Sequence, residues 1–364
     1  MTSLDQFEAR RLDDATPEGR AAFLASAEYT AAYNEVLALG GDGGSTPTDR
    51  TAEQSEIGIF WGYDGRPGLG TPPRLYNQIV RTVAEQEGNT EAENARLFAL
   101  VNIAMTDAGL TSWDDKYEQD FWRPILGIRG GDGDGNDQTV GDTDWTPLGA
   151  PASNPQAGEI NFTPPFPAYT SGHATFGAAA FQMLARFYGT DDISFSFTSD
   201  EFNGVTVGSD DAVRPIATRT FDSFTDAKLE NGESRIYLGI HWRFDADEGV
   251  ATGDAVADYV FDSILVPGQV RGHHSGGHAR GRMVGVARSP GAPAVEPSSP
   301  RPHSMPDPAE IETARIVTTR NIGVGVAQSQ TVQTPIVYDK PGHRRMSTSH
   351  DAAIIDEVLI GLDE

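Results

Sequence analysis

Apolar side chains recur every three or four positions through most of residues 17–265, which is the periodicity of amphipathic α-helices. The clearest run begins after His173 and ends at Gly189; its apolar positions are Phe176, Ala180, Met183, Leu184 and Phe187. The same pattern predicts helices over about residues 17–39, 73–87, 91–108, 113–128, 218–229 and 246–265, with an irregular stretch over 191–214. We therefore expect an all-α fold, a bundle of about six or seven helices.

The composition of the chain changes at Pro267. Gly, Ser, Pro and His dominate from there to about Pro308, as in flexible segments, and a short amphipathic pattern returns over Asp351–Leu362. We expect three parts: a short N-terminal helical segment over residues 1–59, a catalytic helical bundle over 60–267, and a flexible Gly/Pro/His-rich tail over 268–364 with a short terminal helix.

The chain is strongly acidic. Its 364 residues include 53 Asp and Glu against 27 Lys and Arg, a formal net charge of −26, and lysine occurs only at Lys116, Lys228 and Lys340. Such a lysine-poor acidic composition is typical of proteins from extreme halophiles, and a high-GC genome gives the same preference for arginine. A nucleic acid is excluded as a general partner, so any anionic ligand must enter a local basic pocket.

The absence of cysteine excludes disulfides, thiolate metal sites and a cysteine nucleophile. No run approaches 18 consecutive apolar residues, and the N-terminal residues lack the basic and then apolar pattern of a signal peptide. We expect a soluble protein without a membrane span; the sequence leaves open whether it is cytoplasmic or secreted.

A Pro-rich stretch leads into Thr170-Ser171-Gly172-His173, where the clearest helix begins. Pro favours an extended entry, and a hydroxyl side chain can cap the first turn. The free N–H groups and positive dipole end of a helix start favour a bound oxyanion. A serine here is also an ordinary helix cap, so this stretch gains its weight from two others.

The second stretch contains Lys116 and Arg123-Pro124 within an aromatic-rich segment. Seven residues are two helical turns, so both cations can project from one face, and Pro124 turns the chain at Arg123. A solvated surface pair is the alternative interpretation.

The third stretch offers Arg235, His241 and Asp245. Asp245 lies four residues after His241, where a carboxylate can accept the imidazole proton and fix its tautomer. A single histidine in an apolar run is commonly a packed core residue. However, only two of the eight histidines precede residue 270, and both, His173 and His241, fall in these candidate stretches.

The three stretches together supply three cations, two neutral donors and two imidazoles; they are Lys116, Arg123, Arg235, Ser171, Gly172, His173 and His241. Such a set matches a tetrahedral oxyanion, either phosphate or vanadate. Two imidazoles suggest that one binds the central atom and that the other handles protons.

These motifs, Lys-x6-Arg-Pro, Ser-Gly-His and Ser-Arg-x5-His-x3-Asp, resemble in order those of the type 2 phosphatidic acid phosphatase superfamily. That superfamily includes acid phosphatases, lipid phosphatases and vanadium-dependent haloperoxidases. One position departs from it, since Thr170 stands where the family usually has Pro. From about Phe60 to Pro267 the flanking sequence resembles the vanadium chloroperoxidases; the stretches that carry this are Phe60–Gly65, Gly70–Gln78, Trp113, Pro165–Tyr169 and Ile240–Ala246.

The resemblance implies a vanadate cofactor and a role for each matching residue. His241 would bind vanadium, and the residues holding the vanadate oxygens would be Lys116, Arg123, Ser171, Gly172 and Arg235. His173 would be the acid–base residue for peroxide, and Lys116 would polarise that peroxide. Trp113 and Phe166 would shape the halide pocket, Phe166 being the residue of the chloride-oxidising branch. Asp64 would brace Arg235, as Asp245 would His241.

The family fold is two stacked four-helix bundles with the site in the second. This chain resembles the second bundle, so the first is expected to be shortened or missing. The implied activity is oxidation of halide by hydrogen peroxide to hypohalous acid, which passes to a small organic acceptor. The alternatives are an acid phosphatase that uses His241 as nucleophile and His173 as acid, and a non-enzymatic anion-binding protein. Halide preference, organic substrate, homo-oligomerisation, the role of the tail, and whether the chain is a fragment stay open.

Overall fold

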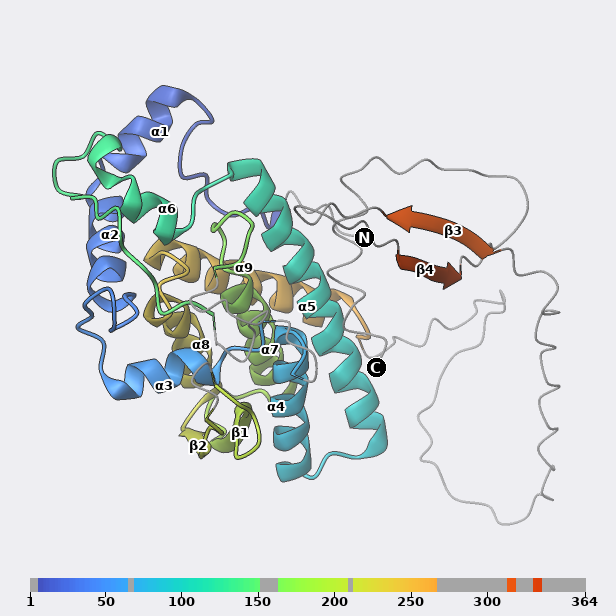
Figure 1. Cartoon of the computed structure of the whole chain (residues 1–364). Helices are drawn as coiled ribbons and strands as arrows, with labels where there is room; N and C mark the ends of the chain where they lie inside the picture. Colours follow the sequence, from blue (N-terminus) through green and yellow to red (C-terminus); the bar gives the residue numbers. More distant parts are fainter. Residues whose placement is uncertain are drawn as a thin grey trace, which may run out of the picture. The chain divides into compact units, whose positions relative to one another are not determined.

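The computed structural model describes residues 6–64, 69–150, 163–208, 212–266, 313–318 and 330–335. The chain divides into two compact units, residues 1–271 and residues 272–363. The helices of the first unit are α1 (Pro17–Leu24), α2 (Ala27–Leu39), α3 (Ala52–Phe60), α4 (Pro72–Gln86), α5 (Glu91–Gln119), α6 (Pro124–Arg129), α7 (Gly172–Tyr188), α8 (Phe224–Tyr237) and α9 (Arg243–Ser263). A 3₁₀ turn, η2, covers Gly131–Gly133. The prediction of a mainly helical bundle is confirmed (Figure 1).

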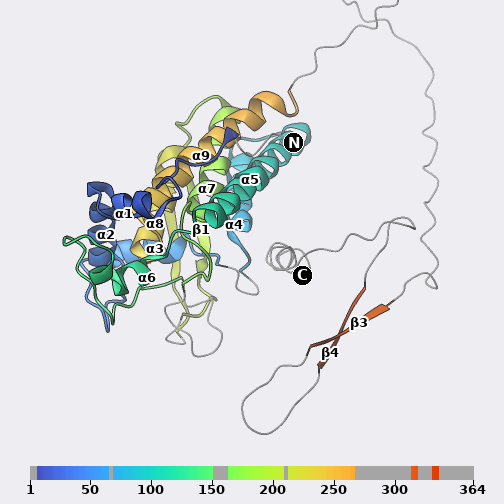
Figure 2. The same cartoon turned by 90° about the horizontal axis from the view of Figure 1, so that it is seen from above.

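Helix α7 is the centre of this unit. It packs against α9, α5 and α8, with α4 at one edge, and the two views in Figures 1 and 2 agree on this arrangement. Ser171 caps α7 and Gly189 ends it in the left-handed conformation at φ 75°, as the sequence predicts. The Ser-Gly-His motif therefore lies at the N-terminal start of a helix that other helices enclose on several sides.

Helix α5 is longer than its sequence pattern suggests. Separate helices are expected over 91–108 and 113–128, but one helix runs from Glu91 to Gln119, and α6 begins at Pro124. Gly109 lowers the helical propensity between the two expected helices. It is nevertheless buried against α7, so tertiary packing carries the helix through it.

Two short strands interrupt the helical body. β1 (Phe195–Asn203) pairs antiparallel with β2 (Ile216–Phe221) in a region expected to be irregular and then helical. Threonines on the two strands bond across the pair, with 2.6 Å between the hydroxyls of Thr198 and Thr218. The expected helix over 218–229 is wrong at its start, because the β-branched residues of β2 favour a strand and α8 begins only after Ser223.

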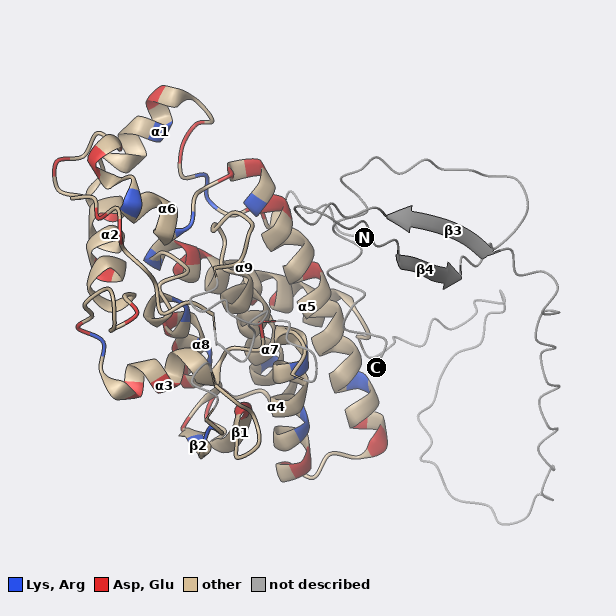
Figure 3. Cartoon of the chain, in the orientation of Figure 1, with Lys and Arg blue, Asp and Glu red and all other residues tan. Residues whose placement is uncertain are grey.

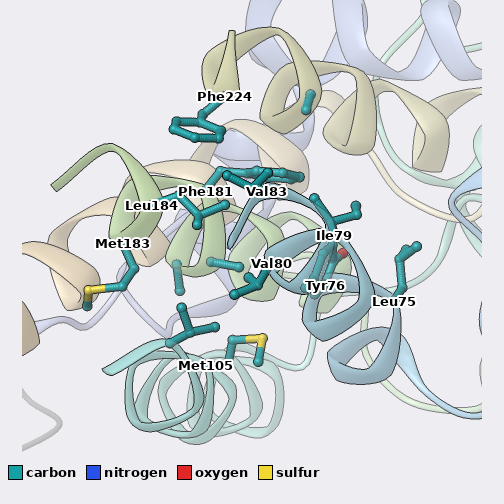
Figure 4. Close-up of a cluster of buried hydrophobic side chains, with 14 of the residues drawn as sticks. Leu75, Tyr76, Ile79, Val80, Val83, Met105, Phe181, Met183, Leu184 and Phe224 are labelled. Carbon is teal, nitrogen blue, oxygen red and sulfur yellow. The ribbon is translucent and has the colours of Figure 1, made fainter. Parts of the chain in front are cut away.

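Among the residues that the structure describes, the buried apolar side chains form two clusters. The larger joins α3, α4 and α5 to the C-terminal half of α7 and to the strands; Figure 4 shows part of it, including Tyr76, Val80, Met105, Phe181 and Leu184. The smaller joins α1, α2 and α6 to the starts of α7 and α9. Helix α7 contributes Ala174 to the smaller cluster and Ala179 to the larger, so its first turn lies where the two clusters meet.

In the second unit the described residues form strands β3 (Thr313–Thr318) and β4 (Gln330–Pro335), which pair antiparallel. The strands lie in the stretch expected to be a flexible tail, where the sequence predicts none. The expected terminal helix over Asp351–Leu362 lies outside the described residues.

None of the described helices has both the length and the apolar character needed to cross a bilayer. Figure 3 shows acidic residues on most helices of the first unit, in keeping with the net charge of −26.

Candidate active site

The start of α7 supplies backbone donors. Ser171 is the N-cap residue, with extended backbone at φ −71° and ψ 116°, and its Oγ accepts from the Ala174 amide at 3.5 Å. Its own amide donates to the Asp245 carbonyl at 2.9 Å, which ties α7 to α9. The next amides, those of Gly172 and His173, belong to a first turn, where no carbonyl within the helix can accept from them. This helix end can therefore receive an anion.

Lys116 projects from the last turn of α5 and is completely buried. Its ammonium donates to three carbonyls just before α7: those of Pro167 at 3.2 Å, Ala168 at 2.9 Å and Thr170. Burial, and then the charge of Arg123, lower the pKa of Lys116 well below its usual range. These contacts hold the Lys116 ammonium beside the start of α7. They also fix the backbone that leads into that helix.

Arg123 caps α6 and is 4% exposed. Its Nε donates to the Phe166 carbonyl at 2.8 Å, and its Nη1 lies 2.9 Å from both the Ile240 carbonyl and His241 Nε2. Its Nη2 is buried without a hydrogen-bond partner. Burial lowers the pKa of Arg123 to about 10. A buried guanidinium N–H with no acceptor is costly, and an oxyanion would satisfy it.

Arg235, on α8, is also completely buried. Its Nη2 faces the carbonyls of Gly58 and Trp61 at 3.4 and 3.3 Å, and its Nη1 lies 3.5 Å from Asp64 Oδ1. Burial is the main cause that lowers its pKa, and the Asp64 carboxylate opposes that shift. Burial in turn raises the pKa of Asp64 to about 6, against the opposing charge of Arg235. Asp64 and Arg235 therefore form a buried ion pair that orients the guanidinium.

His173 lies in the first turn of α7 and is 9% exposed. Its Nε2 is 2.6 Å from the Gly62 carbonyl and 3.7 Å from Asp64 Oδ1. Because a carbonyl only accepts, Nε2 carries a proton, and Nδ1 of the neutral ring is left with the lone pair. Burial, and then the charge of Arg235, lower the pKa of His173 well below the usual value. The ring is therefore neutral and able to accept a proton at Nδ1.

His241 lies between α8 and α9, with Nδ1 3.0 Å from Asp245 Oδ2. The same carboxylate oxygen accepts from the Trp242 amide at 2.9 Å, which fixes its position. A carboxylate at Nδ1 places the proton there and leaves a lone pair on Nε2, which faces Arg123. Burial, and then the charges of Arg123 and Lys116, lower the pKa of His241 well below the usual value.

Lys116, Arg123, Arg235, His173 and His241 thus occupy one buried region. Arg123 contacts His241 directly, Arg235 contacts His173 at 3.4 Å, and the charge of Lys116 acts on both imidazoles. The region contains mainly hydrogen-bond donors, one of them without a partner, together with an imidazole lone pair on His241. This donor set suits a tetrahedral oxyanion, either phosphate or vanadate, whose central atom can accept the imidazole nitrogen.

Aromatic rings border this cluster on one side. The rings of Trp113 and Phe166 are 5.4 Å apart, and both residues are half-buried. The Lys116 ammonium lies 5.6 and 5.5 Å from their centroids, and the Arg123 guanidinium lies 4.9 Å from that of Phe166. Such rings stabilise the two cations and leave an apolar face beside them.

The structure adds two residues that the motifs do not single out. Asn231, on α8, donates to the His173 carbonyl at 2.8 Å, and the Tyr76 hydroxyl on α4 lies 2.9 Å from the same oxygen. Both side chains are completely buried and hold the first turn of α7 from outside. Tyr76 falls in a stretch that carries the family resemblance, but only the packing shows that it reaches the His173 carbonyl.

Asp115, next to Lys116, allows a test of electrostatics beside the cluster. Burial raises the pKa of its carboxyl from 3.8 to about 7, one oxygen accepting from the Ala9 amide and the other having no partner. The ionised form is therefore disfavoured in the fold, and the penalty grows from about pH 4 to pH 7 and stays constant above. We expect Asp115→Asn, which keeps an acceptor for Ala9, to raise the free energy of unfolding by about 1–3 kcal/mol at pH 8 and by almost nothing at pH 4.

Chemical denaturation at the two pH values measures this gain. The neighbouring Asp114 is exposed, so Asp114→Asn is the matched control and should change stability by less than about 0.5 kcal/mol at either pH. An equal gain from Asp115→Asn at pH 4 and pH 8 would contradict the expected cause.

Residues 96–266 match the family model described as the VCPO second helical-bundle domain. Over 254 residues the chain is 45% identical to vanadium chloroperoxidase from Curvularia inaequalis, a match that covers 61% of this chain and 41% of that enzyme. A bacterial vanadium-dependent iodoperoxidase structure aligns with a TM-score of 0.52 and 27% identity, covering 72% of this chain and 54% of that one. A bacterial vanadium-dependent chloroperoxidase in its apo form aligns with a TM-score of 0.51 at 14% identity, which shows a shared fold. The matched region spans about half the length of these relatives.

Proposed function

We propose that this chain, which is similar to the VCPO second helical-bundle domain over residues 96–266 and 45% identical to a vanadium chloroperoxidase over 254 residues, oxidises halide with hydrogen peroxide at a bound vanadate. The product is hypohalous acid, which halogenates a small organic acceptor. The observation that carries the proposal is the buried cluster of three cations and two imidazoles, in which Arg123 Nη2 has no acceptor. We also propose residues 60–267 as the catalytic bundle.

Vanadate, when bound, supplies a Lewis-acidic centre that activates peroxide without changing its own oxidation state. His241 Nε2 is the proposed ligand of the vanadium atom, since Asp245 keeps the proton on Nδ1. Arg123 and Arg235, the Ser171 hydroxyl and the Gly172 amide would hold the oxygens. The two guanidiniums are held by backbone carbonyls, and Ser171 and Gly172 are held by the start of α7, so little reorganisation is needed during the reaction.

Lys116 and His173 have the proposed chemical roles. Lys116 would exchange its longest carbonyl contact, the one to Pro167 at 3.2 Å, for an oxygen of the bound anion and place positive charge there. His173 would accept a proton from hydrogen peroxide at Nδ1, because Nε2 is committed to the Gly62 carbonyl. Trp113 and Phe166 would give the halide an apolar surface beside the two cations.

The test compares vanadate-stripped and vanadate-loaded protein in bromination of monochlorodimedone with hydrogen peroxide and bromide. We expect activity only in the loaded protein, and a higher melting temperature with orthovanadate or phosphate, because a ligand that binds only the folded state stabilises it. Hydrolysis of p-nitrophenyl phosphate is measured in parallel. Phosphatase turnover without halide oxidation would instead assign a phosphohistidine mechanism at His241, and equal activity with and without vanadate would refute the proposal.

A further inference from the structure

Helices α5 and α7 interlock through two glycines and two aromatic rings. Gly109 and Trp113 lie four residues apart on α5, and Gly172 and Phe176 lie four residues apart on α7, so each pair shares one helix face. A Cβ on Gly109 would lie 2.6 Å from Cε1 of Phe176, and a Cβ on Gly172 would lie 2.9 Å from Cζ3 of Trp113. Each glycine therefore makes the space that the ring of the opposite helix occupies.

The interlock extends the aromatic side of the cluster. Phe166, Trp113 and Phe176 form a row, which we call the aromatic row, with centroid distances of 5.4 Å and 6.0 Å between successive rings. One end of the row meets the cations, since the Arg123 guanidinium lies over Phe166. The other end rests in the notch at Gly109. Trp113, in the middle, is held between Phe166, Phe176 and the Gly172 backbone.

We propose that Phe176 and Gly109 set the halide selectivity of the site by positioning Trp113, an inference that rests on the proposed function. The cations lie over the rings of Trp113 and Phe166, whereas Phe176 packs on Trp113 and on Gly109, so we treat Phe176 and Gly109 as positioning residues. Halide ions differ in size and in the energy needed to remove their water. On the proposed function the halide lies beside Trp113 and the cations, so the position of the Trp113 ring sets the size of the ion that is accepted.

Substitutions at Phe176 and Gly109 are expected to change the halide selectivity in opposite directions. Phe176→Leu shortens the side chain that supports Trp113, so the ring can relax away from Phe166 and admit a larger ion. Gly109→Ala adds a methyl group where the Phe176 ring lies, and the displaced ring crowds Trp113. In Gly109→Ala/Phe176→Leu the methyl group fills space that the shorter side chain leaves, so the two effects should offset.

The experiment measures the ratio of kcat/KM for iodide to that for bromide in vanadate-loaded wild type and in the three variants. This ratio is independent of the fraction of folded protein, so loss of stability alone does not move it. We expect Phe176→Leu to raise the ratio on the order of tenfold, the effect of about one methyl group in an apolar pocket. Gly109→Ala should lower the ratio, and the double variant should return towards wild type.

Phe98 gives a matched control, because it is a half-buried phenylalanine of α5 that lies about three helical turns before Gly109. Phe98→Leu should leave the ratio at the wild-type value. Unchanged ratios in both single variants, or an equal change in Phe98→Leu, would overturn the inference while leaving the proposed function intact.

Iodide quenching of Trp113 fluorescence gives a readout that needs no turnover. Of the other four tryptophans, Trp61, Trp145 and Trp242 are completely buried, and the difference between wild type and Trp113→Phe isolates the signal of Trp113. The quenching constant of Trp113 should rise in Phe176→Leu and fall in Gly109→Ala. A wild type that oxidises no halide would refute the proposed function, and this measurement would still decide whether Phe176 and Gly109 control ion access to Trp113.

Discussion

Replacing His173 with alanine is expected to lower kcat for bromide oxidation by about 10²–10⁴-fold, the usual contribution of a positioned general acid–base group. Burial lowers the pKa of the ring, its Nε2 proton is committed to the Gly62 carbonyl, and the lone pair of the neutral ring therefore lies on Nδ1. Removing it leaves Lys116, Arg123, Arg235 and His241 in place. Vanadate affinity, measured by titration against the rise in melting temperature, should therefore change far less than kcat.

Gln182→Ala tests whether any change on α7 gives the same loss. Gln182 lies on the same helix, but its amide binds Asp258 on α9, outside the cluster. The Gln182→Ala variant should keep kcat near the wild-type value. If His173→Ala keeps full kcat, the acid–base assignment fails, and a loss of vanadate affinity as large as the loss of kcat would make His173 an anion ligand instead.

Changes at His241 are expected to act on vanadate binding. His241→Ala removes the proposed nitrogen ligand and should abolish vanadate-dependent oxidation at any practical vanadate concentration. Asp245→Asn keeps the shape but removes the carboxylate that fixes the ring, and should weaken vanadate binding by about 10–100-fold, as changes to residues that orient metal ligands do. High vanadate should then restore much of the activity of Asp245→Asn, whereas His241→Ala should stay inactive.

Asp258→Asn is the control for Asp245→Asn. Asp258 lies on the same helix, α9, and pairs with Arg186 near the surface. Its replacement should leave the vanadate dissociation constant unchanged. Vanadate affinity equal to wild type in Asp245→Asn would show that the carboxylate does not orient His241.

The sequence located the candidate residues because each motif is local. Ser171 at the start of a helix, Pro124 after Arg123, and Asp245 four residues after His241 are arrangements fixed by neighbouring residues and by helix geometry. In the structure each of these arrangements is present. The catalytic roles assigned to them stay predictions, which the substitutions above test.

Local sequence patterns do not predict the features that depend on contacts between distant parts of the chain. Helix α5 continues through Gly109, where the Phe176 ring of α7 packs on the glycine, although glycine lowers the helical propensity there. The pairing of β1 with β2 depends on neighbours across the two strands, on which β propensity itself depends. Asn231 on α8 and Tyr76 on α4 both donate to the His173 carbonyl on α7, so these contacts connect three helices.

The sequence by itself determined which chemical groups this protein possesses and how each is presented locally, because helix periodicity and capping act over a few residues. Only the tertiary structure decided that these groups meet in one buried place. Burial there lowers the pKa of both imidazoles, leaves one guanidinium N–H of Arg123 without an acceptor, and aligns three aromatic rings beside the cations. These effects arise from desolvation and from contacts between helices far apart in the chain, which no local pattern encodes.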